Sequence, residues 1–125
     1  MQTPDGYILT VFRIPGIIGE TVNPNKPPVL FQHGILDSAD CWIMNKPEVA
    51  PAFVVARQGY DVWLGNARGN KYSREHVKLT TYDAAFWDFD FQVIGAGDLP
   101  GMLEYIRSYH GDVKVAYIGH SQGTS

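Results

Sequence analysis

The sequence predicts an α/β fold with a mainly parallel sheet and helices on both faces. Short apolar runs alternate along the chain with segments of helical spacing, and glycine-containing turns end most of them. Strands and helices that alternate in this way build a parallel sheet through crossover connections. No repeat or low-complexity segment interrupts the pattern. We therefore expect residues 1–125 to belong to one domain.

The composition is typical of a globular protein, with 45% hydrophobic and 18% charged residues. The net charge of -3 is spread without a long run of either sign, so we expect no nucleic-acid partner. No apolar run approaches the roughly 20 residues that span a bilayer, and Met1 does not open a signal peptide. Cys41 is the only cysteine, and we expect it to act as a small buried hydrophobe.

The first half of the chain is expected to form three strands and one helix. Residues 7–14 are rich in β-branched and aromatic side chains, which favours a strand. Residues 29–31 and 60–64 are short apolar runs bounded by turn residues, which is typical of buried strands. Between them, residues 50–58 have helical spacing, and Gly59 is placed to end that helix.

The second half is expected to form one more helix and one more strand. Asp98 can cap a helix in which Pro100 occupies the first turn, and Gly111 can end it. Residues 113–118 then form an apolar strand. An aromatic cluster precedes the helix and is expected to lie in the core: Phe86, Trp87, Phe89 and Phe91.

The pattern Gly-x-Ser-x-Gly follows this last predicted strand directly, at Gly119, Ser121 and Gly123. This is the context of a nucleophile elbow, in which a strained turn lifts the serine hydroxyl above the sheet. The flanking residues must be small because strand and helix approach closely there. The sequence therefore predicts Ser121 as the nucleophile of an acyl-transfer reaction, a chemistry for which we expect no metal and no cofactor.

A second motif lies where such a reaction needs it, at the end of an earlier predicted strand. Acyl transfer places negative charge on the substrate carbonyl oxygen, and backbone N–H groups from two loops usually stabilise it. The candidates are the amides of Gln122, directly after the nucleophile, and Ile35, where Gly34 allows a close turn. We expect His33 to shape this loop by hydrogen bonding rather than to act as the base.

The histidine and carboxylate that complete a catalytic triad are expected outside these residues. In this fold they follow the serine along the chain, and only four residues follow Ser121. His120 should point away from the serine hydroxyl. Three acidic residues have a simpler interpretation as helix caps or solvated charges: Asp88, Asp90 and Asp98.

With these motifs the chain resembles the acid lipases, the family of gastric lipase, lysosomal acid lipase and their insect relatives. The resemblance extends over nearly the whole sequence. It rests on five segments: Thr3-Pro-Asp-Gly-Tyr-Ile-Leu9, Gln32-His-Gly-Ile-Leu36, Gly59-Tyr-Asp-Val-Trp-Leu-Gly-Asn-Ala-Arg-Gly-Asn70, Asp98-Leu-Pro100 and Gly119-His-Ser-Gln-Gly-Thr124.

The resemblance implies an α/β-hydrolase fold and hydrolysis of triacylglycerols or steryl esters, with Ser121 as nucleophile and Ile35 and Gln122 as oxyanion donors. It also implies a secreted or lysosomal location and contact with lipid surfaces through a lid region. By this comparison, residues 1–125 are expected to be the amino-terminal part of the hydrolase domain, ending just after the elbow and inactive alone.

Two alternatives remain open at this point. One is a catalytically inactive, lipase-like binding or structural subunit. The other is an esterase acting on small soluble esters, and the lack of a lid segment would favour this second alternative. In a subunit of only these 125 residues, the strand before Ser121 would expose a large apolar face. We therefore expect further sequence, or another chain, to cover that face of the sheet.

Overall fold

A four-stranded sheet forms the centre of the fold, in the order β2-β4-β3-β6. The computed structural model describes residues 1–21, 23, 25–111 and 113–124. Three strands are parallel, and β2 runs antiparallel at one edge, which confirms the predicted mainly parallel sheet. The strands are β2 (Phe12–Ile14), β3 (Pro28–Gln32), β4 (Asp61–Leu64) and β6 (Ala116–Gly119).

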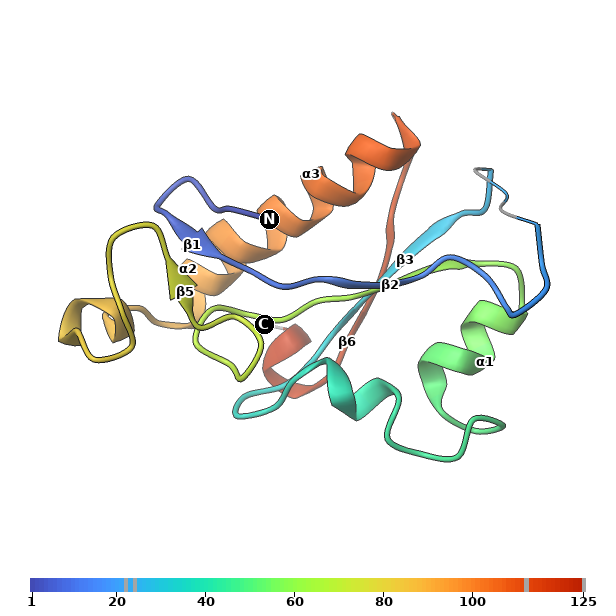
Figure 1. The fold of residues 1–125 in the computed structure, drawn as a ribbon, viewed down its shortest axis with the longest axis horizontal. Helices are drawn as coiled ribbons and strands as arrows, with labels where there is room; N and C mark the ends of the chain where they lie inside the picture. The colour runs from blue at the N-terminus through green and yellow to red at the C-terminus, as the bar shows by residue number, and fades with distance from the viewer. Residues whose placement is uncertain (22, 24, 112, 125) are drawn as a thin grey trace.

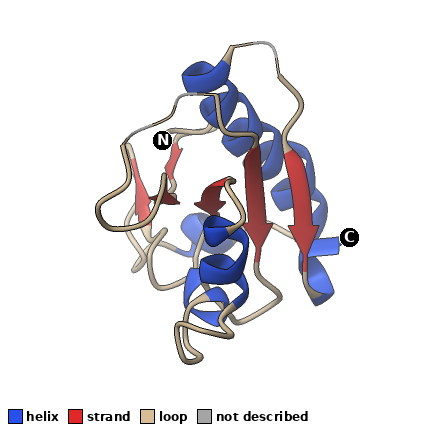
Figure 2. Ribbon diagram, turned by 90° about the vertical axis from the view of Figure 1, so that its right-hand side faces the viewer, coloured by secondary structure: helices blue, strands red, loops and turns tan. Residues whose placement is uncertain are grey.

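Helices cover both faces of this sheet, as Figures 1 and 2 show. The side chains of successive strand residues point to opposite faces, so each strand contributes to two cores. On one face Val29 and Phe31 pack with helix α1 (Pro51–Arg57). On the other face Leu30 packs with helix α3 (Leu99–His110). The predicted layers are confirmed.

Cys41 lies in the short 3₁₀ helix η1 (Ala39–Trp42), half-buried against the core beneath α1. Burial raises the pKa of its thiol to about 11. A thiol with so high a pKa is a weak nucleophile at neutral pH, which agrees with the predicted packing role.

The predicted strand over residues 7–14 is two short strands with different partners. Strand β1 (Tyr7–Ile8) pairs with β5 (Glu75–His76), whereas β2 pairs with β4. Between them, side chains rather than a strand satisfy the backbone of Thr10: its N–H donates to Ser73 Oγ and its carbonyl accepts from Asn66 Nδ2. The strand pattern is therefore interrupted by loop residues more than fifty positions away in the sequence.

The predicted start of the second helix at Asp98 is wrong. A continuous helical stretch begins with α2 (Phe91–Val93), passes through the π-helical turn η3 (Ile94–Asp98) and continues as α3. Asp90 is the actual cap, since its side chain accepts from the N–H of Val93 at 3.1 Å. Even this stretch, like every helix in the part of the chain that the structure describes, is too short or too polar to cross a membrane.

Asp98 is also neither a cap nor a solvated charge. It is fully buried and forms an ion pair with Arg68, whose Nη2 lies 2.7 Å from Oδ1. A buried carboxylate requires such a partner, because transferring an unpaired charge out of water is unfavourable. The residue that explains its position comes from the loop after β4, thirty positions earlier. The predicted termination at Gly111 is confirmed, with φ +75° at that glycine.

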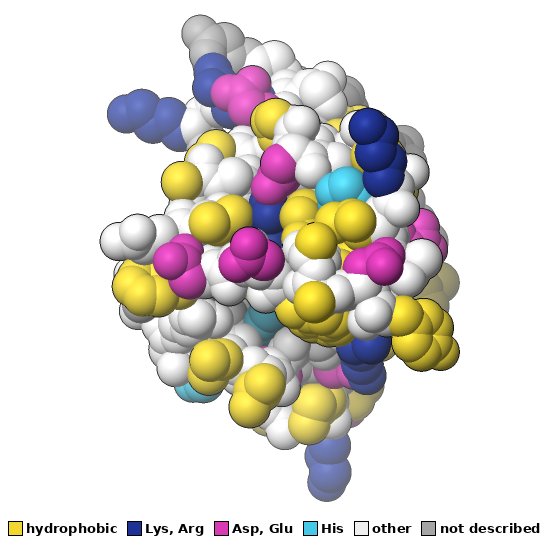
Figure 3. All heavy atoms as spheres, turned by 90° about the vertical axis from the view of Figure 1, so that its left-hand side faces the viewer, with side chains coloured by type: hydrophobic (Ala, Val, Ile, Leu, Met, Phe, Trp, Pro, Cys, Tyr) yellow, Lys and Arg dark blue, Asp and Glu magenta, His cyan; other side chains and the backbone are white. Residues whose placement is uncertain are grey.

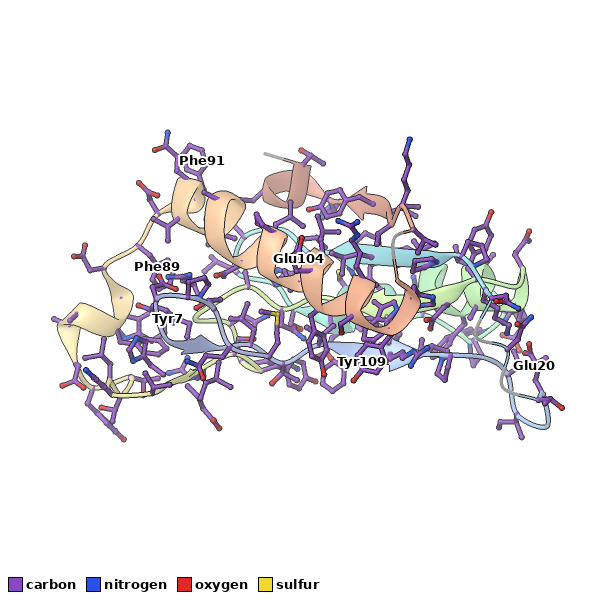
Figure 4. The ribbon with its side chains drawn as sticks, turned by 90° about the horizontal axis from the view of Figure 1, so that it is seen from above. Tyr7, Glu20, Phe89, Phe91, Glu104 and Tyr109 are labelled. Carbon is purple, nitrogen blue, oxygen red and sulfur yellow. The ribbon has the colours of Figure 1, made fainter. Side chains whose placement is uncertain are left out.

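The aromatic cluster is only partly in the core. Phe86 is fully buried, and Phe89 is turned toward Tyr7, with 5.9 Å between the ring centroids (Figure 4). Trp87 and Phe91, however, are 41% and 55% exposed, so the prediction is wrong for these two. Apolar and acidic side chains are intermixed on this side of the molecule (Figure 3).

Strand β6 has only one neighbour, β3, among the described strands. Its apolar side chains Tyr117 and Ile118 are more than a third exposed. A parallel strand normally has both faces covered, so β6 leaves apolar surface exposed in the described part of the chain.

Candidate active site

Ser121 follows the end of β6 and begins the short 3₁₀ helix η4 (Ser121–Thr124). Its φ is +54°, in the left-handed region that side chains other than glycine rarely adopt. The only other described non-glycine residue there is Leu36, in the loop after β3. A serine held in this conformation between a strand and a helix has the geometry of a nucleophile elbow.

Two glycines of the motif lie where no side chain fits. A Cβ on Gly119 would overlap the carbonyl of Gly123, because the two ends of the elbow are in close backbone contact. A Cβ on Gly123 would lie 2.6 Å from the carbonyl oxygen of Gln32 and 2.8 Å from that of His33. These contacts are with backbone atoms, which cannot move aside as a flexible side chain can. The sequence requirement for small residues thus has a direct steric cause.

The elbow and the loop after β3 lie against each other at the same end of the sheet (Figure 1). Gln32 and Gly119 are paired in the register of β3 and β6, and the N–H of His120 donates to the Gln32 carbonyl at 3.1 Å. A Cβ on Gly34 would lie 3.1 Å from Ser121 Cβ. The two motifs singled out in the sequence are therefore neighbours in space.

An open cavity of about 800 Å³ extends from this junction. Both residues considered as oxyanion donors, Ile35 and Gln122, lie along it. Apolar side chains form much of its lining, together with charged ones such as Asp37, Asp40 and Lys71. The lining includes Leu36, Met44, Arg68, Trp87, Phe91 and Ile94. The dimensions and apolar character suit an organic ligand rather than a small ion.

His33 is buried and has a structural role, as expected from the sequence. Its Nε2 accepts a hydrogen bond from the N–H of Ala67 at 3.0 Å and is therefore unprotonated. The neutral ring then carries its proton on Nδ1, which lies 2.7 Å from the carbonyl oxygen of Gly34 and donates to it. Burial lowers the pKa of His33, which favours this neutral form. Both ring nitrogens are engaged, so His33 is not available as a base.

Two asparagines of this region were not recognised from the sequence. Asn66 is fully buried, and its Oδ1 accepts from the N–H of Ala39 at 2.9 Å. Asn70 donates to the same Oδ1 at 2.8 Å and lies 3.1 Å from His33 Nε2. Together they connect the loop after β4 with the loop after β3. Both asparagines belong to the Gly-Asn-Ala-Arg-Gly-Asn segment, which contributes to the family resemblance. Their spacing in the sequence, however, did not indicate which groups they would bind.

A histidine–carboxylate pair exists elsewhere in the described residues. His110 Nε2 lies 2.6 Å from Asp61 Oδ2, and Arg13 forms an ion pair with the same carboxylate. Asp61 is the first residue of β4, whereas Ser121 lies beyond the last residue of β6, and these two strands run in the same direction. The pair therefore lies at the opposite end of the strands from the elbow. Within the described ranges, no group of three metal-ligating side chains is present either.

Known proteins share sequence and fold with this chain. Residues 1–46 match the family described as a partial alpha/beta-hydrolase lipase region, and residues 27–125 match the alpha/beta hydrolase fold. Gastric triacylglycerol lipase of Rattus norvegicus is 46% identical over 98% of this chain, and lipase 1 of Drosophila melanogaster is 46% identical over 98%. The chain covers 31% and 26% of these two proteins, so it spans between a quarter and a third of their length.

A solved structure, the thioesterase domain from the curacin biosynthetic pathway, has the same fold, with a TM-score of 0.58 and 22% identity. The comparison covers 98% of this chain and 38% of that one. The sequence matches confirm the resemblance to acid lipases that the motifs indicate. The chain therefore belongs to the α/β-hydrolase fold family, within the group of lipases that carries the partial α/β-hydrolase lipase region.

Proposed function

We propose that residues 1–125 form the nucleophile-bearing, amino-terminal part of a carboxylic ester hydrolase of the lipase type. One observation carries the proposal: Ser121 has φ +54° directly after a parallel strand, with Gly34 against its Cβ. A strained serine beside a glycine-containing loop supports nucleophilic attack with stabilisation of the oxyanion by nearby amides.

In this proposal Ser121 Oγ attacks the ester carbonyl carbon and forms an acyl-enzyme as the alcohol leaves. The amides of Ile35 and Gln122 donate hydrogen bonds to the developing oxyanion. A histidine accepts the serine proton and then protonates the alcohol, and a carboxylate orients that histidine. We assign both to sequence that the longer relatives have and residues 1–125 do not. Water hydrolyses the acyl-enzyme, and the reaction uses no cofactor.

We propose a lipid ester, either a triacylglycerol or a steryl ester, as the substrate class. The support is the apolar wall of the 800 Å³ cavity, together with the description of the rat relative as a triacylglycerol lipase. The same relationship supports secretion or a lysosomal location. The exposed apolar surface of β6 supports a further segment, or another chain, that covers the sheet and contributes contact with a lipid surface.

A fluorophosphonate probe tests the nucleophile, because it reacts with an activated serine through the same attack. We expect the native protein that carries residues 1–125 to be labelled at Ser121, identified by peptide mass spectrometry. A Ser121→Ala variant should retain its fold and lose all labelling. A native protein that hydrolyses esters but is labelled at another serine, or not at all, would overturn the assignment.

A further inference from the structure

The loop that carries the Ile35 amide is held at both of its ends by the loop that follows β4. At one end, the N–H of Ala67 donates to His33 Nε2. At the other end, the N–H of Ala39 donates to Asn66 Oδ1. Between these two attachments lie Ile35, whose side chain is 63% exposed, and Leu36, whose side chain is fully exposed. The conformation of this exposed segment therefore depends on contacts at its buried ends.

Asn66 is the residue through which the second attachment reaches the sheet. Its Nδ2 donates to the carbonyl of Thr10 at 2.9 Å, next to β2, while its Oδ1 accepts from Ala39. Asn70 Nδ2 donates to the same Oδ1 and contacts the histidine of the first attachment. A fully buried carboxamide with its donor and acceptor both engaged has one low-energy orientation. Asn66 thus fixes residue 39 relative to the sheet.

We propose that Asn66 is a positioning residue for the oxyanion-binding amide of Ile35, an inference that rests on the proposed function. Asn66 contacts neither the nucleophile nor the cavity. It acts by keeping the segment from His33 to Ala39 in place, so that its amide faces the site next to Ser121. An amide aimed at a developing charge stabilises the transition state more than the bound ester, so its displacement lowers kcat with little effect on KM.

The test uses the native protein and p-nitrophenyl butyrate, a soluble ester that avoids effects of a lipid interface. Asn66→Ala should lower kcat by about ten- to a hundredfold, less than the loss of an entire oxyanion donor, and change KM by less than about threefold. Asn66→Asp keeps an oxygen for the Ala39 N–H but loses the donor to the Thr10 carbonyl, so its kcat should fall as well, because the link to the sheet is broken.

Two further variants separate positioning from general loosening of the loop. Ser73→Ala removes buried hydrogen bonds to Thr10 and to the Asn66 carbonyl without touching residues 33–39, and its kcat should stay within about twofold of the wild type. Ala39→Pro deletes the N–H that Asn66 accepts, at the first position of η1, where proline is tolerated. Ala39→Pro should lower kcat as much as Asn66→Ala does. If Asn66→Ala does not fold, Ala39→Pro alone tests the positioning role.

The outcomes are distinct from those that concern the proposed function. Absence of fluorophosphonate labelling in the wild type would refute the hydrolase itself. With the wild type labelled and active, the positioning role is overturned by a kcat loss as large in Ser73→Ala as in Asn66→Ala. It is equally overturned when Asn66→Ala and Ala39→Pro keep wild-type kcat, or change KM alone.

Discussion

Arg68 binds Asp98 through both its backbone and its side chain. The backbone N–H donates to Asp98 Oδ2 at 2.8 Å, and the guanidinium Nε donates to Oδ1 at 2.8 Å. The same guanidinium reaches Asp5 near the amino terminus at 2.6 Å and lies 4.0 Å from the centre of the Tyr7 ring. One buried cation therefore joins the amino-terminal turn, the loop after β4 and the π-helical turn.

Removing Asp98 should be far more destabilising than removing Asp5. Asp98→Ala leaves a buried guanidinium with one carboxylate fewer, which should lower the free energy of unfolding by about 3–5 kcal/mol. The Asp5 side chain is 51% exposed, so Asp5→Ala should cost about 1 kcal/mol or less. Chemical denaturation of the native protein and the two variants measures both values. Equal losses would show that the burial of Asp98 is unimportant.

Two glycine-to-alanine changes should have opposite effects. Gly123→Ala places a methyl group against the carbonyls of Gln32 and His33 and should destabilise the protein by about 1–3 kcal/mol, with loss of Ser121 labelling. Gly101→Ala lies inside α3, where the new methyl meets only the flexible end of Met1, and should stabilise by up to about 1 kcal/mol. Thermal unfolding and labelling rates compare them. A tolerated Gly123→Ala would contradict the close-packed elbow.

The features predicted best from the sequence are those with a local signal. Residues 29–31 form part of β3 because a short apolar run can bury both faces of a strand, and residues 50–58 match α1 because helical periodicity ends at Gly59. The elbow at Ser121 was also predicted from a local pattern, since close backbone contacts leave no room for a side chain at Gly119 and Gly123.

The features predicted poorly depend on residues distant in the sequence. Asp98 followed by Pro100 has the local appearance of a helix start, but an ion pair with Arg68 outweighs that preference. Likewise, the connection from Asn66 to Ala39 spans 27 residues, and no periodicity or spacing encodes it. Phe91 was predicted to lie in the core but borders the cavity, because hydrophobicity alone does not reveal which side chains line a cavity.

Acidification should weaken the fold through His33. Burial lowers the pKa of His33 in the folded protein, while the unfolded chain keeps an ordinary value near 6.5. Below about pH 6.5 the unfolded state binds more protons, so this contribution to stability is present at pH 7.5 and is lost as the pH falls. Denaturation midpoints at pH 7.5 and pH 5.5 should differ more in the wild type than in His33→Asn. The same pH dependence in both proteins would assign it to other groups.

Phe86 and Phe91 should separate packing from contact with substrate. Phe86 is fully buried, so Phe86→Ala should cost about 3–5 kcal/mol of stability. Phe91 is 55% exposed beside the cavity, so Phe91→Ala should cost less than about 1 kcal/mol. Under the proposed function, Phe91→Ala should nevertheless lower kcat/KM several-fold more for p-nitrophenyl palmitate than for p-nitrophenyl acetate, because only the long chain reaches this wall. An equal effect on the two esters would place the acyl chain elsewhere.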